Sequence, residues 1–189
     1  AQWFYDQKNI GTRIKAPVEL IAGIRRMLPM ELEIPESQLL LQRLLGQVLF
    51  YPPNVAGWPG GKSWIDSSSL MTRMRIPQLL NDVDDLNIAP KDDDDQMMGR
   101  MDKNNAAMGK NALMRNKPLK ADIDWSLLVK SLESVKREKL LPTLQSALLQ
   151  IKPAYGSTVM NSFIDSSSKE KYIKSATIHI MSAPEYQVC

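Results

Sequence analysis

The residues of this chain that could do chemistry gather in one segment rich in proline, glycine and tryptophan, residues 50–65. Within it, residues 56–63 form a relaxed phosphate-loop pattern in which Ala56 replaces the first glycine. Such a loop wraps phosphate oxygens in backbone N–H groups at the start of a helix, and a lysine and a serine complete the site. Pro59 removes one of the N–H donors, and a leucine-rich helical pattern precedes the segment where a buried strand is needed. The pattern therefore favours an ordered structural loop over nucleotide binding.

The other chemically capable residues are too few or too poorly spaced to form a site. His179 is the single histidine, which excludes a catalytic triad or a multi-histidine metal site within this chain. Residues 92–95 are aspartates, but Met97 and Lys103 stand where a calcium loop needs glycine and glutamate, so they indicate a solvated acidic run. Cys189 is the only cysteine and is expected at a mobile end without an activating base. The sequence predicts no catalytic residue, no metal ligand and no cofactor.

The composition is that of an ordinary globular domain. Of the 189 residues, 43% are apolar and 24% charged, which predicts a single domain over residues 1–189. The net charge is +3, the basic residues are scattered and only 6% of the residues are aromatic, so we expect no nucleic-acid partner. No apolar run reaches the length of a membrane span, and no signal peptide is recognised at Ala1, where the chain is expected to begin within a longer protein.

Apolar residues recur at helical spacing, which predicts an all-α fold: an irregular bundle of about six or seven helices. No segment is convincing as a strand. Residues 36–50 are apolar on more than one face, which predicts a central helix with Gly46 inside it. Residues 81–121 change in composition and are expected to form a partly mobile insertion. We expect helices to begin at Pro17, Glu36, Ser63, Asp124, Pro142, Ser157 and Ser167, the last with a capping box to Glu170.

Between the second and third of these helices lies the candidate structural or interface loop. Its prolines restrict the backbone, its glycines permit unusual backbone angles, and its tryptophans offer large surfaces that must be buried or presented. The Trp58–Pro59 bond could be cis, although trans is the more common state. We expect the loop to lock helices together or to form a seam with another part of the protein. Its residues are Pro52, Pro53, Asn54, Gly57, Trp58, Pro59, Gly60, Gly61 and Trp64.

Three motifs carry a resemblance to a known family. They are residues 14–20, residues 52–61 with Trp64 and Ile65, and residues 181–187. In this order they resemble the bacterial domain-of-unknown-function family number eighteen hundred. The resemblance implies the C-terminal part of a longer protein that is often exported, hence a periplasmic or extracytoplasmic location. It also implies two candidate partners, the protein's own N-terminal region and the product of a neighbouring sulfatase-like gene.

No catalytic residues are established for that family, so the resemblance implies none here. Two functions stay open at this point. The first is a non-enzymatic helical module for assembly or partner binding. The alternative is part of an enzyme whose active site lies at the seam with the N-terminal half, to which Asn54, Lys62 or His179 would contribute.

Overall fold

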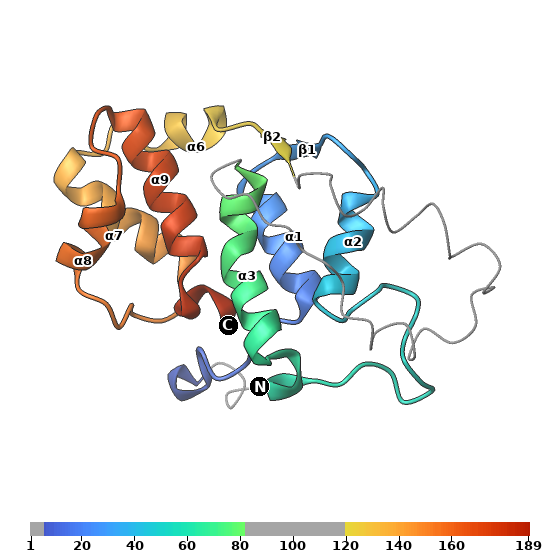
Figure 1. The fold of residues 1–189 in the computed structure, drawn as a ribbon. Helices are drawn as coiled ribbons and strands as arrows, with labels where there is room; N and C mark the ends of the chain where they lie inside the picture. Colours follow the sequence, from blue (N-terminus) through green and yellow to red (C-terminus); the bar gives the residue numbers. More distant parts are fainter. Residues whose placement is uncertain (1–5, 82–119) are drawn as a thin grey trace.

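The computed structural model describes residues 6–81 and 120–189, and in these ranges the chain is mostly helical, as the sequence predicts (Figure 1). The expected insertion at residues 81–121 and the acidic run at residues 92–95 therefore lie almost entirely outside the described residues. Short 3-10 turns lie at η2 (Gln7–Asn9), η3 (Gly61–Trp64) and η4 (Pro184–Gln187). The seven α-helices of the described ranges are α1 (Pro17–Met27), α2 (Ser37–Leu44), α3 (Ser67–Leu80), α6 (Ser126–Ser131), α7 (Arg137–Leu148), α8 (Ser157–Phe163) and α9 (Lys169–Met181).

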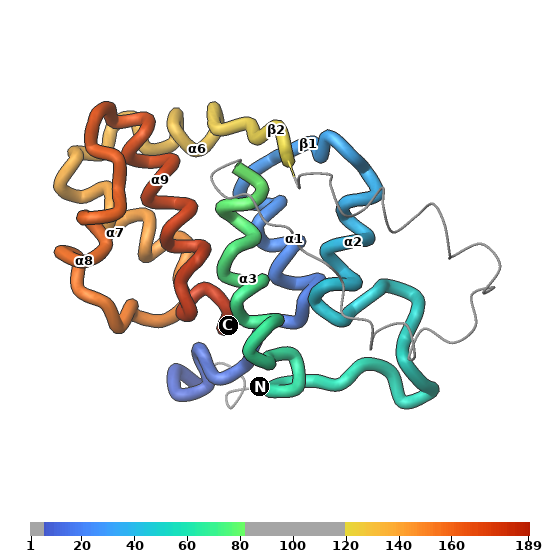
Figure 2. The backbone as a smooth tube through the Cα atoms, in the orientation of Figure 1, coloured from blue at the N-terminus to red at the C-terminus, as the bar shows by residue number. Residues whose placement is uncertain are grey.

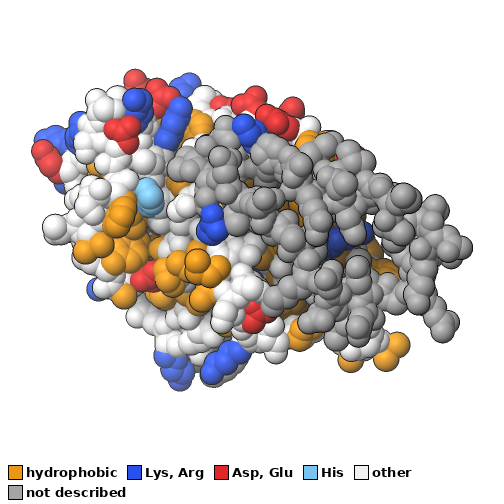
Figure 3. Space-filling view, in the orientation of Figure 1, with side chains coloured by type: hydrophobic (Ala, Val, Ile, Leu, Met, Phe, Trp, Pro, Cys, Tyr) orange, Lys and Arg blue, Asp and Glu red, His pale blue; other side chains and the backbone are white. Residues whose placement is uncertain are grey.

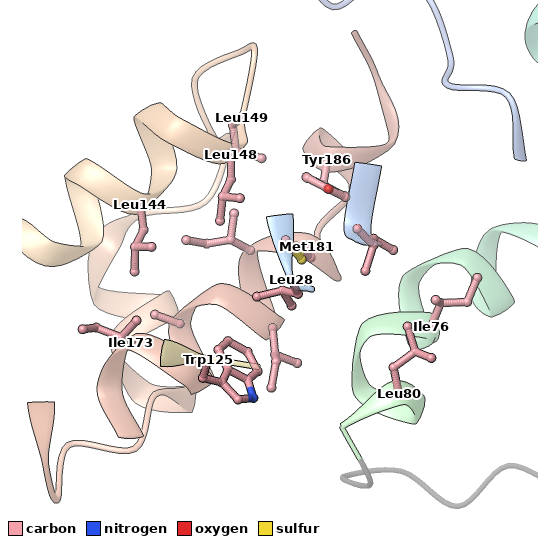
Figure 4. Packing of buried hydrophobic residues seen from close by; sticks show 14 of the residues in the cluster. Leu28, Ile76, Leu80, Trp125, Leu144, Leu148, Leu149, Ile173, Met181 and Tyr186 are labelled. Carbon is pink, nitrogen blue, oxygen red and sulfur yellow. The ribbon is translucent and has the colours of Figure 1, made fainter. Parts of the chain in front are cut away.

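The helices form two groups that meet along α9. Helices α1, α2 and α3 form one group, α7, α8 and α9 form the other, and α9 packs against α3, α7 and α8 (Figures 1 and 2). Buried apolar residues of both groups make one continuous cluster (Figure 4). Ile173, Ala176, Ile180 and Met181 of α9 are fully buried within it. The central helix of the fold is therefore α9.

The prediction of a central helix over residues 36–50 is wrong. Helix α2 ends at Leu44, and Gly46 follows it with a φ of +80°. The N–H of Gly46 donates to the carbonyl of Arg43, and the N–H of Gln47 donates to the carbonyl of Gln42, which is the Schellman pattern of a helix end. Apart from Gly46 itself and its two chain neighbours, no atom lies within 4 Å of a Cβ built on Gly46, so this glycine serves the left-handed turn and no close helix approach.

Most helix starts lie within four residues of the predicted positions, but the capping groups differ. The carboxylate of Asp66 accepts hydrogen bonds from the N–H groups of Ser68 and Ser69, so Asp66 and not Ser63 caps α3. Ser168 caps α9, while Glu170 pairs with the ammonium of Lys174 at 2.6 Å. Helix α7 begins at Arg137 and carries Pro142 inside it. The peptide bonds of the described residues, including Trp58–Pro59, are all trans.

The expectation that no strand exists is also wrong. Strand β1 (Met30–Leu32) pairs antiparallel with β2 (Ala121–Ile123), with Glu31 opposite Asp122. Strands of three residues are too short to show an alternating pattern, which explains the missed assignment. The pairing holds the segment that follows α1 against the segment that precedes α6.

The geometry at the end of α2 predicts the effect of adding a Cβ there. Gly46→Ala should lower the free energy of unfolding by about 1 kcal/mol, because alanine resists the left-handed conformation. Gly60→Ala is the matched control, since Gly60 has a φ of −124° and open space around its Cβ position. It should change the value by less than about 0.5 kcal/mol. Equal effects in urea unfolding would contradict this account of Gly46.

Candidate functional site

The candidate loop has an anchored base. The side-chain carbonyl of Gln42 accepts a hydrogen bond from the N–H of Leu49 at 2.9 Å. The side-chain carbonyl of Gln47 accepts one from the N–H of Val18 at 3.0 Å, at the start of α1. At the far end of the loop, Trp64 is 7% exposed. The beginning of the loop is thus hydrogen-bonded to α1 and α2, and its end is held by the buried Trp64.

The tip of this loop, residues 49–59, is in contrast exposed and mostly apolar. Phe50 is 95% exposed, Val55 is fully exposed and Tyr51 is about half exposed. Pro52, Pro53, Asn54 and Pro59 are also exposed, Gly57 and Trp58 are half-buried, and Gly60 and Gly61 beyond the tip have open space beside them. Figure 1 shows this part of the chain extending away from the helices. The tip offers an apolar surface to its surroundings.

Two further properties distinguish the loop. Residues 37–65 contain no acidic side chain, and their only charges are the cations Arg43 and Lys62. Phe50 has a φ of +64° and is the only non-glycine residue with positive φ in the described ranges. A bulky side chain in this conformation is strained, and such strain is found where function requires a fixed geometry.

The candidate catalytic residues do not come together. Asn54 and Lys62 are exposed in the loop, whereas His179 lies in α9, on the other side of α3 (Figure 1). His179 is half-buried beside Phe163, with 6.0 Å between the ring centroids. Burial lowers the pKa of His179, and a hydrogen bond to the Phe163 backbone opposes that shift. In the described part of the chain no group of three His, Cys, Asp or Glu side chains could hold a metal ion.

A polar junction that joins the first and last motifs was missed in the sequence. Arg73 of α3 is completely buried. Its Nε donates to the side-chain carbonyl of Gln187 at 3.1 Å, and its Nη2 donates to the backbone carbonyl of Lys15. The N–H of Lys15 donates in turn to the backbone carbonyl of Gln187 at 2.9 Å. One sequence signal could have revealed this junction. Arg73 stands three residues before Ile76, at a core position of α3, where an arginine is unusual.

The end of the chain is fastened at the same junction. Ile14 and Val188 form an antiparallel bridge, and the N–H of Cys189 donates to the carbonyl of Arg13 at 2.8 Å. Cys189 is therefore held in place, which corrects the expected mobile end. The ammonium of Lys15 donates to the carbonyl of Tyr186 at 2.7 Å and lies 3.8 Å from its ring centroid.

Burial dominates the electrostatics of this junction. It lowers the pKa of Lys15 and of Arg73, and it raises the pKa of Tyr186 to about 12. Nη1 of Arg73 and Nε2 of Gln187 are buried without a partner in the described residues. Unpaired buried donors lower stability, so the burial of Arg73 depends on the hydrogen bonds that it makes to Gln187 and Lys15.

Comparison with known proteins gives one match. A family model described as a protein of unknown function, DUF1800, matches residues 1–188. No curated protein and no solved structure matches the chain. In the described ranges no helix is long and apolar enough to cross a membrane.

The junction predicts a large loss of stability when Arg73 is removed. Arg73→Ala should lower the free energy of unfolding by about 3 kcal/mol, because it leaves one buried and one partly buried acceptor unpaired. Arg73→Lys should recover less than half of this, since a single ammonium cannot reproduce the guanidinium fork. The exposed Arg26→Ala is the control, with a change below about 0.5 kcal/mol. Urea unfolding measures all three, and equal values for Arg73→Ala and Arg26→Ala would contradict this role.

The conformation of Phe50 predicts a substitution that stabilises the protein. Phe50→Gly should raise the free energy of unfolding by about 1 kcal/mol, because glycine adopts positive φ without strain. Phe50→Ala keeps the strained backbone and removes the same exposed ring, so it should leave the value nearly unchanged. If the two variants were equally stable in urea unfolding, the strain at Phe50 would be negligible.

Proposed function

The chain belongs to the DUF1800 family of proteins of unknown function, and we propose that it is a non-enzymatic binding module whose contact surface is the loop tip. The observation that carries this proposal is the exposed apolar surface at residues 49–55. Of the ten large apolar side chains that are exposed in the described ranges, five lie within residues 39–55: Leu39, Leu49, Phe50, Tyr51 and Val55. Large exposed apolar patches on folded domains mark sites of interaction.

The contrast between base and tip supports a recognition role. Gln42 and Gln47 fix the backbone where the loop begins, and the buried Trp64 fixes it where the loop ends. A surface that is rigid before binding loses little conformational entropy when a partner arrives. The strained φ of Phe50 fits the same interpretation, because strain is retained where it positions a functional side chain.

The enzymatic alternative has less support. The only titratable side chain of the tip is Tyr51, which the enzymatic hypothesis does not use. Of the residues that it does use, Asn54 lies in the tip, whereas Lys62 and His179 lie outside it. Nucleotide binding is disfavoured as well, because helix α2 and a turn lead into the glycines where a phosphate loop needs a strand. For the module as a whole, the proposed protein partners are a preceding N-terminal region of the protein and the product of a neighbouring sulfatase-like gene, in a periplasmic or extracytoplasmic location.

The proposal predicts that the tip touches another macromolecule in the native host. A photo-cross-linking amino acid placed at Phe50 should capture a partner, whether protein or lipid, on irradiation of intact cells. The same amino acid at Met71 is the control, because Met71 is also an exposed apolar residue, at 59%, but lies on α3. The adducts are measured by mass spectrometry of the purified protein.

Capture at position 50 and not at position 71 would support a binding surface at the tip. Equal labelling at both positions, or none at either, would contradict the proposal. A melting temperature within a few degrees of wild type for both labelled proteins shows that the fold is intact, because ring replacement at exposed positions has a small effect on stability.

A further inference from the structure

We infer that the surface bound by the loop tip is the interfacial region of a phospholipid bilayer. This inference rests on the proposed function and names its partner. The tip would lie in the headgroup region as a peripheral anchor, while the helices stay outside the membrane. Two properties of the loop carry the inference: the types of its exposed side chains and its charge.

The exposed side chains are of the types that partition into a bilayer interface. Phe50 and Val55 project fully into solvent and are purely apolar. Tyr51 combines an apolar ring with a polar hydroxyl, and Trp58 supplies a half-buried indole at the edge of the tip. Tyrosine and tryptophan are enriched at membrane interfaces because one end of the ring is apolar and the other can be hydrated. Apolar side chains that enter the acyl boundary supply the affinity.

The charge of the loop suits an anionic bilayer surface. Because residues 37–65 carry no carboxylate, no charge of the loop is repelled by anionic headgroups. Lys62 is exposed beyond the tip, and Arg43 lies half-buried before it. Cations placed next to inserted apolar residues are attracted by anionic lipids.

Some backbone N–H groups of the tip are hydrogen-bonded within the chain, whereas those of Phe50, Asn54, Val55 and Trp58 have no partner in the described residues. Pro52 and Pro53 have no N–H group. The N–H of Tyr51 donates to the carbonyl of Val48, that of Ala56 to the side chain of Asn54, and that of Gly57 to the carbonyl of Asn54. Because an unpaired N–H group is costly in hydrocarbon, the tip must stay at the hydrated headgroup level, where water can pair with these groups. The exposed apolar side chains, the absence of carboxylates and the exposed Lys62 make an anionic bilayer the favoured partner.

The test is binding of the purified protein to vesicles. One set contains phosphatidylcholine alone and the other contains phosphatidylcholine with phosphatidylglycerol, and flotation measures the bound fraction. The tip variant is Phe50→Ser with Val55→Ser. Its matched control is Val159→Ser with Phe163→Ser, a pair on α8 that is 56% and 64% exposed and belongs to a different apolar surface. Figure 3 shows apolar side chains gathered beside the single histidine, His179, which contacts Phe163.

Wild-type protein should bind both sets of vesicles, and the tip variant should bind about tenfold more weakly, since apolar burial supplies the affinity. The α8 control should stay within about twofold of wild type. Lys62→Gln should weaken binding about fivefold on anionic vesicles and leave binding to phosphatidylcholine unchanged. Lipids brominated on the acyl chains should quench tryptophan fluorescence in wild type, and Trp58→Phe should lose most of that quenching.

The outcomes separate this inference from the proposed function. If wild-type protein binds neither vesicle, or if the two double variants lose affinity equally, the bilayer is not the partner of the tip. A protein adduct at position 50 in cells would then keep the binding module and assign it a protein partner. The absence of vesicle binding together with the absence of any adduct at position 50 would overturn both.

Discussion

The described structure depends on how the buried guanidinium of Arg73 is satisfied. A fully buried cation is tolerated only where acceptors are fixed around it, and here the acceptors are carbonyl oxygens from opposite ends of the chain. Lys15 provides a backbone carbonyl and Gln187 a side-chain carbonyl, and the two residues are hydrogen-bonded to each other through their backbones. One side chain of α3 thus holds the segment before α1 and the segment after α9 in a single position.

The same arrangement explains why the base of the loop is held in place while its tip is exposed to solvent. Gln47 bonds the N–H of Val18, three residues after Lys15, so the loop is attached to the segment that Arg73 fixes. At the other end of the loop, Asp66 caps α3, the helix that carries Arg73. Both ends of the loop are therefore connected to the junction through short paths, and turn hydrogen bonds to Val48 and Asn54 shape the tip itself.

The sequence predicts the helical class and most helix positions, because residues such as Ile21, Ile24, Ile173 and Ile180 repeat at helical spacing and face the core. It fails at residues 36–50 for a physical reason. The spacing of apolar residues shows where they recur along the chain. It does not distinguish an apolar side chain that is buried in the core from one that is exposed on the surface. The run up to Phe50 looks like a central helix because apolar residues of both kinds are mixed in it.

The remaining differences have separate causes. The junction could not be derived, because its acceptors are backbone and amide carbonyls that carry no signal in the sequence, although Arg73 itself stands at a core position. The candidate loop was identified from its prolines, glycines and tryptophans, but its division into an anchored base and an exposed tip depends on tertiary contacts. Trp64 and Trp58 belong to one motif and nevertheless differ in burial, since only Trp64 reaches the base.

Phe50 gives the most direct support for the proposal that the tip is a contact surface. Its ring is 95% exposed, so it adds almost nothing to the core, and its φ of +64° is one that glycine adopts at lower cost. A phenylalanine at this position therefore lowers the stability of the isolated domain through backbone strain, and its exposed ring gains no burial on folding to offset that cost. Under the proposed function, burial of the ring against an apolar partner is favourable and offsets the strain. The conformation is then unfavourable in the free protein and favourable in the bound one.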